Sequence, residues 1–161
     1  MDNSKKTKRK ILVTQALPYA NAPLHLGHIL EAVQTDIWTR FQNFNDNECL
    51  FFCADDTHGT PVMLKANEMG IKPEELISDV YKDHKSSYEL YGINFANFYS
   101  THSDENRKYS EYIYECAKNN NLISKANIEQ YYDEKEEMFL SDRFIKGTCP
   151  KCGAEDQNGD N

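Results

Sequence analysis

In the first part of the chain, short continuous runs of apolar residues alternate with a segment in which apolar residues recur every three or four positions. Residues 11–14 are a short apolar run, and residues 49–54 are a continuous apolar run typical of a strand covered on both faces. A strand, a helix and a second strand in succession predict a βαβ unit, and therefore an α/β fold with a parallel sheet. Between the two runs, apolar residues recur every three or four positions, as on the one buried face of a helix: Leu26, Ile29, Leu30, Val33, Ile37, Phe41 and Phe44.

The same reasoning predicts three further helices and one extended segment. We expect a short helix over residues 61–69 that stops at Gly70, and a longer helix over residues 73–91. An extended segment follows around residues 95–99. Residues 101–104 resemble a capping box that opens a helix running through Cys116. After about residue 120 charged residues and isolated aromatics replace the helical spacing, which predicts a domain boundary there.

Composition narrows the class of protein. The 161 residues suffice for one domain, or for one domain and the start of another. The formal net charge of −8 argues against a general nucleic-acid coat, although a local basic patch could still dock one structured RNA. Five of the first ten residues are basic and predict a flexible tail over residues 1–9. No apolar stretch approaches membrane-spanning length, so we expect no membrane partner and a cytoplasmic protein.

Two histidines, His25 and His28, stand between the first predicted strand and the helix that follows it. A helix N-terminus carries free N–H groups and a partial positive charge, which suits an anion such as a phosphate. The imidazoles would donate hydrogen bonds to phosphoryl charge, and Gly27 would let a flat base approach the backbone. The alternatives are histidines that cap the helix or fill the core, and a zinc pair, for which a third ligand is not evident.

A second candidate, Asp55-Asp56, follows the second predicted strand. Ligands bind open α/β sheets at the carboxyl ends of the strands, so this loop and the histidine loop should open on the same edge. One carboxylate there could hold a substrate ammonium through a charge-assisted hydrogen bond. The alternative is a solvated acidic turn.

The five cysteines do not form the framework of a disulfide-rich secreted protein. Cys49, Cys53 and Cys116 lie in apolar patterns and are interpreted as buried free thiols. Cys149 and Cys152 are interpreted as half of a zinc knuckle, which needs two more ligands. Redox activity is the alternative interpretation of this pair.

The segment from Leu17-Pro18-Tyr19-Ala20-Asn21 to His25-Leu26-Gly27-His28 resembles the signature of class I aminoacyl-tRNA synthetases, and among them of the methionyl-tRNA synthetases. Residues 54–61 and 142–152 match the same family. The three motifs occur in the family's order, and the resemblance covers residues 10–161.

The resemblance implies the first half of a Rossmann-like catalytic domain over residues 10–119. It also implies the start of a connective insertion with half a zinc knuckle over residues 120–161. The implied activity is that of a methionine–tRNA ligase, which activates methionine with ATP and Mg²⁺ to methionyl-adenylate and then transfers the methionyl group to tRNA(Met). The family's Lys-Met-Ser-Lys-Ser loop is missing, so we expect an N-terminal fragment that is inactive alone.

The resemblance also assigns roles to individual residues. His25 and His28 would stabilise the ATP phosphates in the transition state, and Gly27 would accept the adenine. Cys149 and Cys152 would be two of four Zn²⁺ ligands.

For methionine, the resemblance places Asp56 at the ammonium and Leu17 and Tyr19 at the side chain. The residues alone do not distinguish such an apolar pocket from one for leucine or isoleucine. The rival functions are another adenylyl-transferring enzyme of the same superfamily, a non-catalytic zinc-ribbon binding module, and a truncated reading frame without activity.

Overall fold

The computed structural model describes residues 8–127, 129–134, 138–140 and 145–158. The chain divides into two compact units, Met1–Tyr109 and Ser110–Asn161. Helix α4 (Asp104–Asn119) runs across this division, so the domain boundary expected near residue 120 stays a prediction. Most of the expected basic tail, including Lys5 and Lys6, lies outside the described residues.

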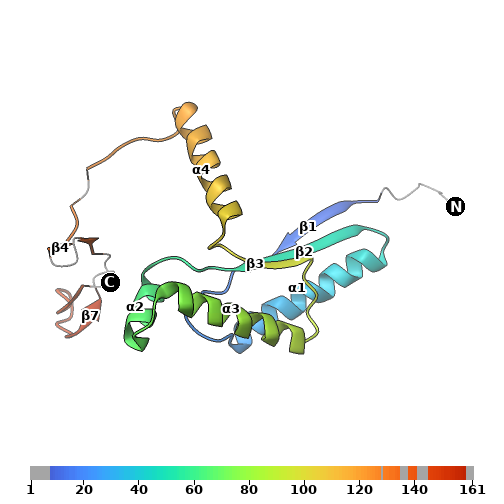
Figure 1. Cartoon of the computed structure of the whole chain (residues 1–161), viewed down its shortest axis with the longest axis horizontal. Helices are drawn as coiled ribbons and strands as arrows, with labels where there is room; N and C mark the ends of the chain where they lie inside the picture. The colour runs from blue at the N-terminus through green and yellow to red at the C-terminus, as the bar shows by residue number, and fades with distance from the viewer. Residues whose placement is uncertain (1–7, 128, 135–137, 141–144, 159–161) are drawn as a thin grey trace. The chain divides into compact units, whose positions relative to one another are not determined.

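The first unit is built on three parallel strands, β1 (Lys10–Thr14), β2 (Glu48–Asp55) and β3 (Asn97–Ser100). The order in the sheet is β1-β2-β3, with β2 in the centre (Figure 1). Ile11 lies opposite Cys49, and Cys53 lies opposite Phe98. The predicted α/β class and parallel sheet are therefore confirmed.

Three helices connect the strands. Helix α1 (Leu26–Phe44) links β1 to β2, and helices α2 (Thr60–Met69) and α3 (Pro73–Leu90) link β2 to β3. Prolines stand in the first turns of α2 and α3, where a missing N–H costs no hydrogen bond. Gly70 ends α2 in the left-handed conformation at φ 66°, as predicted.

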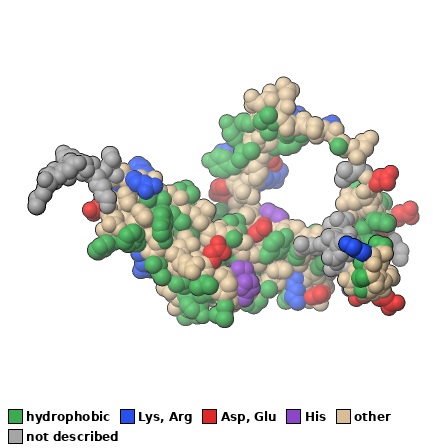
Figure 2. Space-filling view, turned by 180° about the vertical axis from the view of Figure 1, so that it is seen from behind, with side chains coloured by type: hydrophobic (Ala, Val, Ile, Leu, Met, Phe, Trp, Pro, Cys, Tyr) green, Lys and Arg blue, Asp and Glu red, His purple; other side chains and the backbone are tan. Residues whose placement is uncertain are grey.

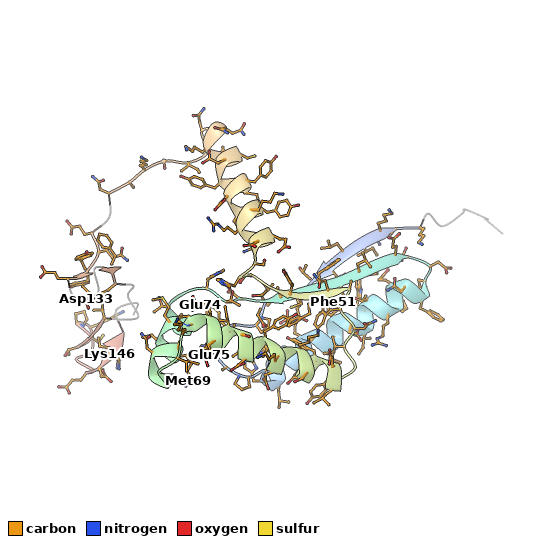
Figure 3. The ribbon with its side chains drawn as sticks, in the orientation of Figure 1. Phe51, Met69, Glu74, Glu75, Asp133 and Lys146 are labelled. Carbon is orange, nitrogen blue, oxygen red and sulfur yellow. The ribbon has the colours of Figure 1, made fainter. Side chains whose placement is uncertain are left out.

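One core joins α1, β2 and α3 on a single face of the sheet. Phe51 of β2, labelled in Figure 3, is 1% exposed. It packs with Ile29 and Ala32 of α1, with Tyr88 of α3, and with Ile93. Because side chains alternate along a strand, the residues of β2 that share this face are buried as well: Cys49, Cys53 and Asp55.

The buried face of α1 overlaps the predicted one only in part, at Ile29 and at the partly buried Val33. The helix buries Ile29, Ala32, Asp36 and Thr39, whereas most of the predicted apolar stripe is exposed, including Leu30, Ile37 and Phe41. Apolar spacing alone does not determine how the helix is rotated toward the sheet. The expectation that β2 is covered on both faces is also wrong for the described residues, because Leu50 points away from the helices and is exposed.

Two further expectations need correction. Helix α4 begins where predicted, but its cap is the Ser103 hydroxyl, which accepts from the Asn106 N–H at 3.3 Å. Cys49 and Cys53 are buried, as expected, whereas Cys116 is only half-buried. Burial raises the pKa of the Cys53 thiol to about 12, which makes it a poor nucleophile.

The second unit contains two short antiparallel strand pairs. Strand β4 (Tyr132–Asp133) pairs with β5 (Met138–Phe139), and β6 (Lys146–Gly147) pairs with β7 (Gln157–Asn158). The residues of the third sequence motif at positions 142–144 lie outside the described residues. Among the described residues no helix is both long and apolar enough to cross a membrane.

Truncating Phe51 should destabilise the first unit far more than truncating Phe44, which is 87% exposed. We expect Phe51→Ala to lower the free energy of unfolding by about 3–5 kcal/mol, because it leaves a cavity in the core. Phe44→Ala should change it by no more than about 0.5 kcal/mol. Urea titrations of both variants measure the difference, and equal losses would contradict the packing described here.

Candidate functional site

The loop after β1 and the end of β2 are joined by backbone hydrogen bonds. The Asp56 N–H donates to the Pro18 carbonyl at 2.9 Å, and the Ala20 N–H donates to the Asp56 carbonyl at 2.8 Å. Tyr19 and Asp56 thus form a parallel bridge that extends the pairing of β1 and β2. Both predicted loops therefore open on the same edge of the sheet, as expected from the sequence.

Side chains add to this junction. The Tyr19 hydroxyl donates to the His58 carbonyl at 2.6 Å and so ties the first loop to the second. Leu17 and Tyr19 alternate with the buried Pro18 and Ala20, which leaves Leu17 exposed and Tyr19 half-buried. The three residues expected at a methionine site, Leu17, Tyr19 and Asp56, thus belong to one junction.

His25 and His28 stand at the N-terminus of α1, where the sequence placed them. His25 is the N-cap, and its Nδ1 accepts from the Gly27 N–H at 3.0 Å. The Nδ1 of His28 accepts from the His25 N–H at 3.4 Å, which completes a reciprocal capping box. The two rings stack with centroids 3.6 Å apart. The alternative interpretation from the sequence, that these histidines cap the helix, is therefore confirmed.

The caps also fix the tautomers of the two rings. An imidazole whose Nδ1 accepts a hydrogen bond carries its proton on Nε2. In both His25 and His28, the Nε2–H is the donor left available for a ligand, and His25 is exposed to solvent. Histidine side chains reach the surface in Figure 2.

Electrostatics keep His28 neutral. Burial lowers the pKa of His28 below its ordinary value of 6.5, and the nearby charges of His25 and His84 lower it further, against an opposing effect of Glu31. A neutral ring can accept at Nδ1 and donate at Nε2 at the same time. The low pKa therefore preserves both the cap and the free donor near pH 7.

Gly27 is required by the His25 ring. A Cβ at this position would lie 2.8 Å from Cε1 and 3.0 Å from Nδ1 of His25, closer than side chains normally pack. The sequence suggested that this glycine lets a base approach the backbone. The structure gives a separate reason, which is that the capping ring folds over the glycine.

The two aspartates after β2 have different environments. Asp55 is fully buried and contacts His84 of α3, so the solvated acidic turn is wrong for this residue. Asp56 is only half-buried and lies beside Tyr19. Asp56 is thus the accessible carboxylate, whereas sequence reasoning missed the pairing of Asp55 with His84. The only signal for His84 was a histidine in an otherwise apolar stripe.

The residues after β3 hold the second loop from its other side. The Thr57 N–H donates to the Thr101 hydroxyl at 2.9 Å, and the two hydroxyls lie 2.8 Å apart. The rings of His58 and His102 approach to 3.3 Å between Nε2 and Nδ1. Sequence reasoning had assigned residues 101 and 102 to a capping box and missed this contact.

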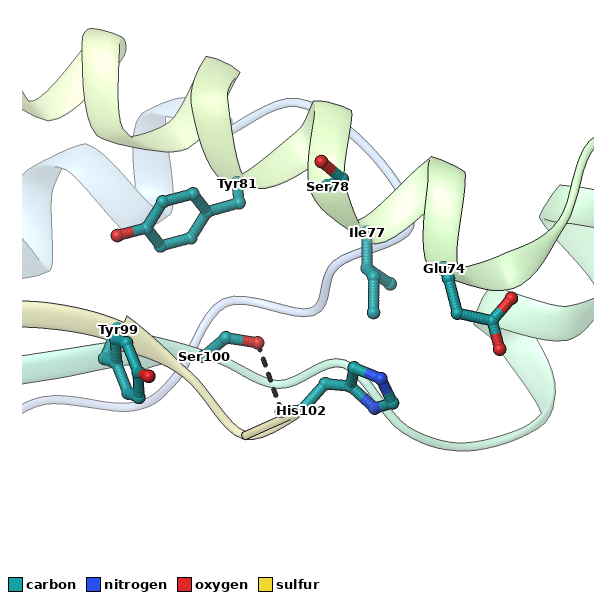
Figure 4. Close-up of a pocket in the computed structure, with 7 residues that line it drawn as sticks. All are labelled: Glu74, Ile77, Ser78, Tyr81, Tyr99, Ser100 and His102. Atoms are coloured by element: carbon teal, nitrogen blue, oxygen red, sulfur yellow. Dashed lines mark hydrogen bonds between the residues drawn. The ribbon is translucent and has the colours of Figure 1, made fainter. Parts of the chain in front are cut away.

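A pocket of about 300 Å³ lies beside these residues, between α3 and the end of β3 (Figure 4). Tyr81 of α3 faces Tyr99 and Ser100 of β3 across it, and the His102 N–H donates to the Ser100 hydroxyl at 3.1 Å. None of the sequence-predicted site residues lines this pocket. It neighbours the junction without being part of it.

Cys149 and Cys152 lie on a tight turn in the second unit. The Cys149 N–H donates to the Ala154 carbonyl at 2.8 Å, and the Gly153 N–H donates to the Cys149 carbonyl at 2.9 Å. Hydrogen bonds from the backbone N–H groups of Cys152 and Lys151 lower the pKa of Cys149, which favours the thiolate. Among the described residues no group of three or more His, Cys, Asp or Glu side chains could hold a metal ion.

A family model described as class I tRNA synthetases (M) matches residues 11–161. The chain therefore belongs to this family of class I tRNA synthetases. Methionine–tRNA ligases of two strains of Leptospira biflexa serovar Patoc are 60% identical to it over 152 residues. The match covers 94% of this chain and 22% of each relative, so the chain spans about a fifth of the length of these curated relatives.

Solved structures share the fold. Mycobacterium tuberculosis methionyl-tRNA synthetase in complex with methionyl-adenylate aligns with a TM-score of 0.74 at 22% identity, over 92% of this chain and 30% of that chain. The ternary complex of Agrobacterium radiobacter K84 agnB2 LeuRS with tRNA and LeuAMS aligns with a TM-score of 0.72 at 23% identity, over 94% of this chain and 20% of that chain. At these identities the likeness shows the fold of a class I synthetase catalytic domain.

Gly59 should tolerate alanine much less well than Gly70. Gly59 has φ 106° and ψ 172°, a region essentially confined to glycine, and a Cβ there would lie 2.5 Å from the Tyr19 hydroxyl. We expect Gly59→Ala to cost about 2–3 kcal/mol of unfolding free energy. Gly70→Ala meets no atom within 4 Å and should cost about 1 kcal/mol. Chemical denaturation of both variants measures the two losses of unfolding free energy. A loss in Gly59→Ala no larger than that in Gly70→Ala would contradict the close approach of Gly59 to Tyr19 described here.

Proposed function

We propose that this chain is the N-terminal part of the catalytic domain of a methionine–tRNA ligase. The single observation that carries the proposal is the 60% identity to methionine–tRNA ligases over nearly the whole chain. The geometry supports it, because the loop after β1 and the loop after β2 meet at one sheet edge. In the proposed reaction, a carboxylate oxygen of methionine attacks the α-phosphorus of ATP, the bond to the β-phosphate breaks, and pyrophosphate leaves.

In this proposal the N-terminus of α1 binds the ATP phosphates. His25 and His28 donate from Nε2 to phosphate oxygens, where charge develops in the transition state. The helix dipole favours the same negative charge, and Mg²⁺ enters with ATP as part of the substrate. Gly27 has no side chain, and the adenine would approach its backbone on the side that the His25 ring does not cover.

The methionine would bind at the junction between the two loops. Asp56, the accessible carboxylate, accepts hydrogen bonds from the substrate ammonium. Leu17 and Tyr19 offer apolar surface to the thioether side chain, and the bond from the Tyr19 hydroxyl to the His58 carbonyl holds that ring in place. The methionyl group would then pass from the adenylate to tRNA(Met) with release of AMP, a step that would need parts of the protein beyond this chain.

The second unit would be the start of a zinc-bearing connective insertion. Cys149 and Cys152 fit half of a thiolate zinc site, since the turn between them directs backbone N–H groups at the Cys149 sulfur. Two further ligands are needed for four-coordinate Zn²⁺. Bound there, Zn²⁺ would hold the turn together and take no part in the reaction.

His28→Ala should slow adenylate formation by about 100-fold or more, because one transition-state donor is lost. The KM for ATP should change little, since the lost interaction acts mainly in the transition state. Methionine-dependent ATP–pyrophosphate exchange in the full-length protein that contains this chain measures both quantities. Leu30→Ala, at an exposed position of the same helix, is the control. Unchanged exchange kinetics in His28→Ala would remove the assignment.

Asp56→Asn should weaken methionine binding, because the ammonium loses a charged acceptor. We expect the KM for methionine to rise by about 10-fold or more, which corresponds to roughly 1.5–3 kcal/mol for a hydrogen bond to a charged group. Asp79→Asn removes only the exposed ion pair with Lys82 and should leave this KM unchanged. A normal methionine KM in Asp56→Asn would contradict the role of Asp56.

A further inference from the structure

A buried histidine joins three elements behind the candidate site. His84 lies in α3, and its side chain, like that of Asp55 at the end of β2, is 0% exposed. The Nδ1 of His84 lies 2.7 Å from Oδ1 of Asp55, and its Nε2 lies 2.8 Å from the carbonyl oxygen of Ala22. Ala22 belongs to the loop that leads to His25. One ring therefore contacts both the end of β2 and the loop that leads to α1.

Both ring nitrogens of His84 face hydrogen-bond acceptors. A carbonyl oxygen accepts only, and so does an ionised carboxylate. With Asp55 ionised, satisfying both contacts requires a proton on each nitrogen, and the ring is then an imidazolium. Burial acts to lower the pKa of His84, but the hydrogen bonds to Asp55 and to the Ala22 carbonyl, together with the charge of Asp55, raise it above 6.5.

We propose that His84 is a positioning residue. Its imidazolium ties the Ala22 carbonyl, three residues before the N-cap His25, to Asp55, the neighbour of Asp56. This link sets the spacing between the imidazole donors of the phosphate subsite and the carboxylate of the ammonium subsite. The inference rests on the proposed function, since those subsites take their meaning from it, whereas the link itself is a feature of the fold.

The charges around His84 fit this role. Asp55 of β2 and Asp83 of α3 stabilise the imidazolium, and the charge of His84 helps to keep His28 of α1 neutral. Glu31 of α1 acts on His28 in the opposite direction. Burial raises the pKa values of Cys53 and Tyr88, so these two groups stay uncharged beside the pair near pH 7. The arrangement thus links the buried ion pair to the protonation state of a candidate catalytic ring.

The kinetic test compares His84→Gln with Tyr88→Phe in the full-length protein. His84→Gln removes the imidazolium, whereas Tyr88→Phe removes a different buried hydrogen bond of α3, the one to Gln15. We expect His84→Gln to lower kcat for adenylate formation by about 100-fold, the scale of an ångström of misplacement, with little change in either KM. Tyr88→Phe should keep the wild-type kcat. Equal kinetics in the two variants would overturn the proposal.

Hydrogen exchange separates this inference from the proposed function. His84→Gln should speed amide exchange at residues 20–28 while Tyr88→Phe does not, whether or not the protein activates methionine. The His84→Gln variant could lose amide protection at these residues while the wild-type protein shows no methionine-dependent ATP–pyrophosphate exchange. That result would leave the link intact and overturn the proposed function. Unchanged protection in His84→Gln would overturn the link.

A measurement on the wild-type chain covers the case in which His84→Gln fails to fold. With histidine nitrogens labelled with ¹⁵N, the two ring nitrogens of His84 should both resonate as protonated at pH 7. A ring protonated on one nitrogen only would overturn the proposal.

Discussion

Two backbone hydrogen bonds between the loop after β1 and the first residue after β2 hold the candidate site together. They run from the Asp56 N–H to Pro18 and from the Ala20 N–H to Asp56, and they extend the parallel pairing of β1 and β2 beyond the end of the sheet. Asp56, which follows the end of β2, is thereby held by its pairing with the loop after β1. This pairing fixes Asp56 against residues 18–20, and the proposed His84 link would set its spacing from the helix that carries His25 and His28.

The geometry of the histidine pair is compatible with both a structural and a chemical role. A capping residue and a ligand donor are usually treated as rival interpretations of a histidine at a helix start. Here the cap uses Nδ1 of each ring and leaves each Nε2–H available. The cap therefore determines the tautomer and orients the free donor. Preorganised donors of this kind need no rearrangement when charge develops on a ligand.

Much of the first unit could be predicted from the sequence because its signals are local. Helix α1 runs over Leu26–Phe44, the range over which the apolar spacing predicts a helix. The meeting of the two loops at one edge also followed from the parallel sheet. Tyr19 and Asp56, 37 positions apart in the sequence, lie side by side as a result.

Other features could not be predicted because they depend on which faces meet. The apolar stripe of α1 predicts Ile29, but the assembled fold also buries Ala32, Asp36 and Thr39, which the stripe does not contain. His84 and Asp55 are 29 residues apart, and nothing local marks them as partners. Thr57 and Thr101 are 44 residues apart and lack any motif of their own. Long-range polar pairs of this kind are set by the assembled fold.

The most direct test of the account is a crystal structure of the full-length protein with methionyl-adenylate bound. The account predicts that the Nε2 atoms of His25 and His28 face the phosphate side of the bound adenylate. It also predicts that the Asp56 carboxylate lies within hydrogen-bond distance of the ammonium. An adenylate bound away from the N-terminus of α1, or an ammonium held by other residues, would contradict it.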